Sequence, residues 1–348
     1  MKFILFCNLP YSFSILKPLE KEITKRGFEY IWYIPESIRE IFPYSTDNFT
    51  TKIDVIKNFK SNVIFVPGNE VPHFLQGIKV QVFHGLAGEK KGHFRIRNYF
   101  DLYLTQGPYF TKKFQELSQK YRNFEVKETG WCKLDKLYSV SKNVLALKEN
   151  LLHQYGVENI ILYSPTFSPS LTSASKLIDE IKKLSEEQGV LVIVKFHDKM
   201  DKNVVQEYKA LKSKNLLISQ EKDILPLLQI ADLMISDTSS VVYEFILLDK
   251  PVITLDSISE NINWEDVADS KEVYSLSLEI SNGKDAFLEK RAETIANYHP
   301  YSDGKSASRM IEATINYKEQ YGVPLKRKLS LWRKFKSYKK YGIKFLFS

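Results

Sequence analysis

Three hydroxyl side chains follow an aspartate at one point of the sequence, in the stretch ISDTSSVVYEFILLDKPV at 235–252. The pattern predicts a short strand, a turn at Asp237, and a helix that begins among Thr238, Ser239 and Ser240. A single Ser or Thr is enough to cap a helix. Three hydroxyls beside unpaired backbone N–H groups, at the positive end of the helix dipole, favour a phosphate-binding site.

A glutamate follows on the same helix, five residues after Ser239. From this position the Glu244 carboxylate can accept hydrogen bonds from the two hydroxyls of a ribose whose phosphates bind the helix start. The alternative is a helix with more caps than it needs and a solvated glutamate. We favour the nucleotide interpretation on the chemistry of the donors.

A histidine ends another predicted strand, VQVFHG at 80–85. A histidine at a strand end is often structural, but His84 and Gly85 are followed by a glycine-containing basic loop. With an ordinary pKa near about 6.5, His84 is suited to accept the proton of an alcohol at neutral pH. The basic loop contains Lys90, Lys91, His93, Arg95 and Arg97.

Further polar side chains stand where other predicted strands end or where a late helix begins. Each is ambiguous alone, but hydroxyls, histidines and cations that converge on one cleft indicate a nucleotide diphosphate. The members of this set are Ser164, Thr166, Lys195, His197, Lys305 and Arg309.

Apolar runs alternate with helical periods along most of the chain, which predicts βαβ units and parallel sheets. The fold class is therefore α/β, with two Rossmann-like domains whose strands point their carboxyl ends toward a shared cleft. We expect an N-terminal acceptor domain at 1–140, a C-terminal nucleotide domain at 141–322 and a basic amphipathic tail at 323–348. Strands are expected at 2–7, 28–34, 62–67, 80–85, 101–105, 159–165, 190–196, 215–219, 232–236 and 251–256.

The net charge of +8 is concentrated at the end of the sequence. Nine of the 50 Lys and Arg residues lie at 326–348, which has no Asp or Glu, and the other 41 are balanced by 42 acidic residues. This distribution argues against a nucleic-acid groove. The cations, with Trp332, Phe335, Tyr338, Phe345 and Phe347, predict attachment to an anionic membrane surface. The two cysteines exclude a disulfide framework and suit a cytoplasmic protein on the inner face of the membrane.

The motifs, taken in order, resemble the CDP-glycerol glycerophosphotransferase family of teichoic acid and capsule synthesis. A series of this kind is specific, although any one of its members is not. The motifs are the HG loop from His84, T-G-x-x-x-x-D at 129–135, YSPTF at 163–167, KFH at 195–197, SDTSS at 236–240, KP at 250–251 and DGKSASR at 303–309.

The resemblance implies the GT-B fold and transfer of a polyol phosphate from a CDP-polyol to a glycan or lipid-linked hydroxyl, with release of CMP. It implies His84 as general base, His197 as a phosphate-stabilising histidine, and Thr238, Ser239 and Ser240 as ligands of the diphosphate. We expect no cofactor and no obligatory metal. One departure is that KFHD replaces the family's KPHP-like motif.

Two alternatives stay open. The turn at Asp237 also resembles the D-S-G-G-x-x-x-E signature of UDP-N-acetylglucosamine 2-epimerases, with Glu244 at the ribose, so a nucleotide-sugar GT-B enzyme is the nearest rival. A non-catalytic GT-B-like protein that binds glycan or lipid is the other. We prefer the transferase because Ser239 and Ser240 stand where the epimerases have glycines, and because of the HG loop.

Overall fold

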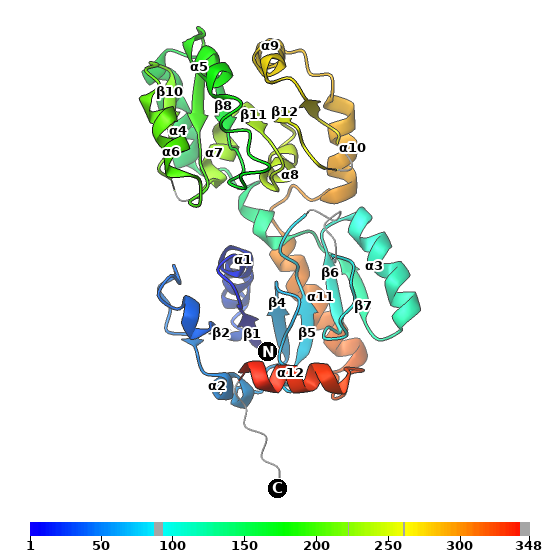
Figure 1. The fold of residues 1–348 in the computed structure, drawn as a ribbon. Coiled ribbons are helices and arrows are strands. Elements are labelled where there is room, and N and C mark those ends of the chain that lie inside the picture. Colours follow the sequence, from blue (N-terminus) through cyan, green and yellow to red (C-terminus); the bar gives the residue numbers. More distant parts are fainter. Residues whose placement is uncertain (87–92, 222, 260–261, 342–348) are drawn as a thin grey trace. The chain divides into compact units, whose positions relative to one another are not determined.

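A computed structural model describes residues 1–86, 93–221, 223–259 and 262–341. The chain folds into two compact units. Unit 1 combines Met1–Tyr138 with Asn297–Ser348, and unit 2 is Ser139–Ala296. Figure 1 shows the elements of each unit along the chain.

Unit 1 is built on a parallel sheet with the strand order β3-β2-β1-β4-β5-β6-β7. Helix α1 packs against α11, and both contact the short 3₁₀ segment η2. Helix α1 also contacts β1 and β2, and α11 contacts β5 and β6. The strands are β1 (Lys2–Phe6), β2 (Glu29–Tyr33), β3 (Phe49–Thr50), β4 (Val63–Val66), β5 (Ile78–Gln81), β6 (Leu102–Thr105) and β7 (Glu125–Glu128). The helices are α1 (Ser12–Lys25), η1 (Glu36–Ile38), α2 (Ile53–Asn58), α3 (Pro108–Tyr121), η2 (Cys132–Lys136), α11 (Ser306–Tyr321) and α12 (Leu331–Tyr341).

Unit 2 repeats the parallel arrangement with the strand order β10-β9-β8-β11-β12-β13. The strands are β8 (Asn159–Tyr163), β9 (Val190–Val194), β10 (Leu216–Ile218), β11 (Leu233–Ser236), β12 (Val252–Leu255) and β13 (Glu265–Val267). The helices are α4 (Lys142–Tyr155), α5 (Ile178–Glu186), α6 (Lys202–Ala210), α7 (Leu225–Ile230), α8 (Val241–Ile246), α9 (Ser270–Ser281) and α10 (Leu288–Tyr298).

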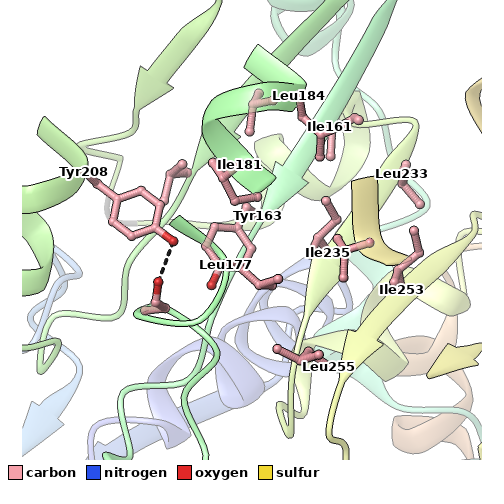
Figure 2. Close-up of a cluster of buried hydrophobic side chains, with 14 of the residues drawn as sticks. Ile161, Tyr163, Leu177, Ile181, Leu184, Tyr208, Leu233, Ile235, Ile253 and Leu255 are labelled. Carbon is pink, nitrogen blue, oxygen red and sulfur yellow. Dashed lines mark hydrogen bonds between the residues drawn. The ribbon is translucent and has the colours of Figure 1, made fainter. Parts of the chain in front are cut away.

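The core of unit 2 explains why its strands read as continuous apolar runs. Side chains of Ile161, Ile235 and Ile253, from three neighbouring strands, meet α5 residues such as Ile181 (Figure 2). The Tyr208 hydroxyl of α6 enters this core and donates to the Ala174 carbonyl oxygen at 2.7 Å (Figure 2). Burial on both faces is the pattern expected of parallel strands covered by helices.

The GT-B-type architecture of two parallel-sheet α/β domains is confirmed, and most predicted strands recur one or two residues shorter. The predicted C-terminal domain, 141–322, differs from unit 2 at its end, because α11 belongs to unit 1. There the Arg26 side chain of unit 1 donates to the hydroxyl of Ser308 at 2.8 Å and pairs with Glu312. Helix α11 is therefore part of the first fold, although it follows the second in sequence.

The basic tail packs onto unit 1 in the part that the structure describes. Leu329 is buried in the core, and the Arg327 guanidinium donates to the Asp101 carboxylate and to the Gly77 carbonyl oxygen at 2.7 Å each. Tyr338 of α12 stacks on Phe74. Trp332 and Leu331 are instead 71% and 82% exposed. The predicted anchors Phe345 and Phe347 lie outside the described residues.

Candidate active site

The imidazole of His84 lies at the carboxyl edge of the unit 1 sheet, where β4, β5 and β6 end side by side. Its Nδ1 is 3.1 Å from the Pro67 carbonyl oxygen. Because a carbonyl oxygen can only accept, Nδ1 carries the proton in the neutral ring, and Nε2 is left with its lone pair. The side chain is exposed. This arrangement presents a base to an incoming hydroxyl group.

The backbone before His84 explains why the strand is shorter than the predicted 80–85. Phe83 has a φ of 59°, in the left-handed region that a bulky residue rarely occupies. Strand β5 therefore stops at Gln81, and the chain turns so that His84 projects from the edge. Gln106, after β6, donates from Nε2 to the Gly85 carbonyl oxygen at 3.0 Å and fixes the other side of the turn.

One residue of the predicted basic loop after His84, His93, is not a cation in the structure. His93 packs face to face on Phe83 with the ring centroids 5.4 Å apart, and against Phe110 and Phe114. Burial, with a smaller contribution from the charge of His84, lowers the pKa of His93 to about 4. His93 is thus neutral at pH 7, which corrects its assignment to the basic loop. Lys90 and Lys91 lie outside the described residues.

In unit 2, Asp237 organises the carboxyl edge of β8 and β11. Its carboxylate is buried and accepts from the Thr166 N–H at 2.9 Å and from the N–H and hydroxyl of Ser173 at 2.8 Å each. Burial raises its pKa, against the effect of these hydrogen bonds. Ser164 is also buried, and its carbonyl oxygen accepts from the Ser236 hydroxyl at 2.7 Å. Asp237 and Ser164 are therefore buried parts of this edge. A ligand can instead reach the residues next to Asp237 in the sequence, which are more exposed.

The three hydroxyl residues differ in what they contact. Thr238 Oγ1 accepts from the Ile258 N–H at 3.1 Å, and Ser239 Oγ accepts from the Val241 N–H at 3.4 Å. A hydroxyl that accepts one hydrogen bond can still donate its proton to a phosphate oxygen. Ser240 is exposed at the start of α8, and Glu244 is half-buried on its first turn. The edge thus places hydroxyl groups next to the start of α8, and their role as phosphate donors stays a prediction.

Lys195 and His197 follow β9 at the same edge, because β9 pairs with β8. His197 Nδ1 accepts from the Lys199 N–H at 3.1 Å, so in the neutral ring Nε2 carries the proton and can donate. Burial lowers the pKa of His197 against the opposing charge of Asp198, with smaller contributions from Lys199 and Lys195. The Lys195 ammonium donates to the Phe196 carbonyl oxygen at 2.7 Å. The His197 ring also lies 4.3 Å from that of Phe167.

Lys305 and Arg309 lie in unit 1, at the start of α11. The backbone N–H groups of Ser306 and Ala307, at this helix start, both donate to the Asp135 carboxylate at 2.8 Å. Arg309 pairs with Asp303 at 2.7 Å and donates to the Thr129 carbonyl oxygen at 2.8 Å. The helix start is therefore filled by the protein's own carboxylate, and the assignment of Lys305 and Arg309 to the donor stays a prediction.

The Lys250 side chain of the KP motif binds backbone carbonyl groups of unit 2. Its ammonium donates to the carbonyl oxygens of Leu228, Gln229 and Ala231 at 3.1, 2.7 and 2.6 Å, at the end of α7. Burial lowers the pKa of Lys250 to about 8. A cation that closes the C-terminal end of a helix satisfies carbonyls that have no partner within the helix.

A cavity in unit 2 lies away from these groups, at the amino ends of β8, β11 and β12. It has a volume of 270 Å³ and is lined by residues that include Asn159, Asp232, Pro251 and Arg291. Open parallel sheets bind ligands beyond the carboxyl ends of their strands. We therefore place the candidate site at the opposite edge, where the polar groups converge.

Comparison with known proteins identifies the family. Residues 15–257, more than half of the chain, match the CDP-Glycerol:Poly(glycerophosphate) glycerophosphotransferase family. The chain belongs to this family. It is 23% identical over 278 residues to the teichoic acid poly(glycerol phosphate) polymerase of Bacillus spizizenii, covering 69% of this chain and 68% of the polymerase. The predicted polyol-phosphate transferase of teichoic acid synthesis is thereby confirmed as the functional class.

A shorter match is to the teichoic acid glycerol-phosphate primase of the same organism. It is 36% identical over 124 residues, which are 34% of this chain and 30% of the primase. Polymerase and primase thus both resemble the chain.

Solved structures agree on the fold. The wall teichoic acid polymerase TagF superposes with a TM-score of 0.63 at 15% identity, over 92% of this chain and 89% of TagF. A putative UDP-N-acetylglucosamine 2-epimerase from Listeria monocytogenes superposes with a TM-score of 0.69 at 16% identity, over 92% of this chain and 97% of the epimerase. Since transferase and epimerase share the architecture, the fold does not separate them, and the sequence family does.

Sequence reasoning missed two residues next to the base. Pro67 ends a strand that was predicted, but periodicity gives no information on which carbonyl accepts from an imidazole. Tyr11 places its ring 5.2 Å from that of His84, between β1 and α1. Nothing in its sequence context distinguishes it from a residue that packs in the core.

Proposed function

We propose that the protein transfers a polyol phosphate from a CDP-polyol to a hydroxyl group of a glycan or lipid-linked acceptor in cell-surface polymer synthesis. The observation that carries this proposal is the His84 ring, whose Nδ1 faces the Pro67 carbonyl oxygen and whose Nε2 is left to accept a proton. An exposed imidazole held in this tautomer is the base that such a transfer requires.

In the reaction, the acceptor oxygen forms a bond to the β-phosphorus of the donor while the bond between that phosphorus and the CMP oxygen breaks. The acceptor proton moves to Nε2 of His84, and CMP departs with the electron pair. Phosphoryl transfer of this kind depends mainly on positioning and on stabilisation of charge. His84 therefore acts on the acceptor, and the donor phosphates need a separate set of groups.

The donor set is the carboxyl edge of unit 2. The hydroxyls of Thr238, Ser239 and Ser240 and the Nε2–H of His197 donate to phosphate oxygens, and the Lys195 ammonium offsets their charge. Glu244 accepts from the ribose. Asp237 contributes by holding the loop that begins at Thr166 against this edge. All these roles are proposed without a metal; among the described residues no cluster of three or more His, Cys, Asp or Glu side chains is placed to bind one.

The membrane surface is the second proposed partner, through the face of α12 that carries Leu331, Trp332 and Phe335. Leu331 and Trp332 project beside the cations Lys336 and Lys339, which are exposed as well. Each basic side chain near an anionic leaflet contributes about 1 kcal/mol, and exposed aromatic groups insert at the interface. Within the described residues no helix is long and apolar enough to cross a bilayer.

The experiment is to incubate the purified protein with CDP-glycerol, CDP-ribitol or UDP-N-acetylglucosamine, with and without a soluble acceptor, and to identify the nucleotide product. We expect acceptor-dependent release of CMP from one of the CDP-polyols. Conversion of the UDP-sugar without CMP release would support the epimerase-like alternative. Binding of a CDP-polyol with no release in any mixture would support the non-catalytic one.

A further inference from the structure

Tyr11 lies beside the proposed base and is open to solvent. Its ring centroid is 5.2 Å from that of His84, with an angle of 31° between the ring planes, and the side chain is 39% exposed. Its hydroxyl also lies over Gly68, where an added Cβ would be 3.7 Å from the hydroxyl oxygen. Tyr11 therefore sits on the Pro67–Gly68 turn that orients the base.

The position combines an apolar face with a hydrogen-bond donor. Burial, with a contribution from nearby Cys7, raises the pKa of the Tyr11 phenol, so the hydroxyl is protonated at neutral pH. Leu9 precedes Tyr11 by two residues in the segment between β1 and α1, and it is 50% exposed. Aromatic faces pack on the C–H groups of sugars and polyols, and the phenolic hydroxyl can bond to their oxygens.

We infer that Tyr11 forms one wall of the acceptor site and holds the carbon skeleton of the acceptor's terminal unit, so that its hydroxyl reaches Nε2 of His84. The inference rests on the proposed function, since it assigns the acceptor to the edge where His84 acts. The ligand chemistry is a hydroxyl-bearing carbon unit with an exposed C–H face. Two sources supply it: a glycerol phosphate terminus and an N-acetylhexosamine terminus.

The competing role for Tyr11 is packing that holds the His84 ring in place. The two roles differ in kinetics. A wall of the acceptor site sets the KM for the acceptor, whereas support for the base sets kcat with every acceptor. Removal of the Tyr11 ring distinguishes the acceptor-site role from the packing role. Removal of the hydroxyl alone shows whether the ring or the hydroxyl contacts the acceptor.

The test compares wild type, Tyr11→Ala and Tyr11→Phe with soluble acceptors that end in glycerol phosphate or in an N-acetylhexosamine. Tyr121→Ala is the matched control, because this tyrosine of unit 1 is 38% exposed at the end of α3. We expect Tyr11→Ala to raise the KM of one acceptor about five- to tenfold, with the KM for the CDP-donor unchanged. Tyr11→Phe should keep most of the affinity, and Tyr121→Ala should behave as wild type.

An unchanged acceptor KM in Tyr11→Ala, or a fall in kcat alone, would overturn the inference and leave the packing role. Direct binding of the same acceptors, measured by calorimetry, separates this result from failure of the proposed function. If wild type releases no CMP but binds an acceptor with an affinity that depends on Tyr11, the transferase proposal fails and the acceptor wall stands. If neither acceptor binds wild type, the inference is overturned.

Discussion

Asp135 caps the helix that begins at Ser306, although 170 residues separate them in the sequence; the carboxylate accepts the N–H of Ser306 at 2.8 Å and that of Ala307 at the same distance. The T-G-x-x-x-x-D motif at 129–135 and the DGKSASR motif at 303–309 therefore contact each other within unit 1. Gly130, in the first motif, has a φ of 78°, and a Cβ there would lie 2.5 Å from the Ser306 hydroxyl. A side chain at residue 130 would therefore clash with the start of α11.

Replacement of this cap should destabilise the fold. Asp135→Ala leaves two backbone N–H groups at a buried helix start without their charged acceptor, so we expect the free energy of unfolding to fall by about 2–4 kcal/mol. Urea unfolding measures the change. Asp54→Ala, at the exposed first turn of α2, is the control and should cost far less. Equal stability of Asp135→Ala and wild type would show that the contact is dispensable.

The hydroxyls at the start of α8 should bind the donor. Ser239→Ala with Ser240→Ala removes two phosphate donors, and we expect the Kd for CDP-glycerol to rise about tenfold or more. Thr238 is kept, because its Oγ1 holds the loop at Ile258. Calorimetry gives the affinity, and Ser275→Ala on α9 is the matched hydroxyl control. An unaltered Kd in the double variant would make both serines helix caps only.

The stability of unit 1 should depend on pH through His93. Its folded-state pKa of about 4 is below the ordinary 6.5, so the neutral form is favoured in the folded protein. The contribution of His93 to the free energy of unfolding is therefore greatest above about pH 6.5. It falls as the pH drops toward 4, by at most about 3 kcal/mol. Because Nε2 is buried with no hydrogen-bond partner among the described residues, His93→Phe should be tolerated and should lessen this loss.

The measurement is the free energy of unfolding of wild type and His93→Phe at pH 7.5 and pH 4.5. Other histidines remain in both proteins, so the difference between the two pH dependences isolates His93. Parallel pH dependences would mean that His93 does not titrate differently in the folded and unfolded states.

Membrane attachment should depend on the exposed face of α12. Leu331→Ser with Trp332→Ser should weaken binding to phosphatidylglycerol vesicles at least about tenfold. The variant keeps Leu329 and Arg327, which join the tail to unit 1, whereas deletion of 326–348 should also destabilise the fold. Leu145→Ser, at a side chain 53% exposed on α4, is the control. Undiminished sedimentation with vesicles would contradict the proposal.

The sequence was sufficient for the inner parallel strands, whereas the short strands β3, β7 and β13 were not predicted. Strand periodicity places His84, His197 and Ser239 at sheet edges, because an alternating series of strands and helices admits few topologies. It was insufficient where a polar motif binds another part of the chain. Arg309 was predicted to contact the donor phosphates, and in the structure its guanidinium pairs with Asp303 and donates to the Thr129 carbonyl oxygen. The Lys250 ammonium of the KP motif donates to carbonyl oxygens at the end of α7.

The tautomer of His84 was also beyond the sequence, since it depends on the Pro67 carbonyl from a neighbouring strand. Orientation of a side chain by a backbone group 17 residues away requires the register of β4 and β5, which periodicity does not give. The type of chemistry could be predicted, and the geometry that directs it could not.

The measurement that tests the central claim most directly is acceptor-dependent CMP release by wild type and His84→Ala, together with their affinities for CDP-glycerol. Loss of the general base should lower turnover by about 100- to 10,000-fold. The affinity for CDP-glycerol should stay unchanged, because the proposed donor groups belong to unit 2. His153→Ala, at an exposed histidine of α4, should match wild type in both measurements. Turnover of His84→Ala close to that of wild type would contradict the role of His84 as the base.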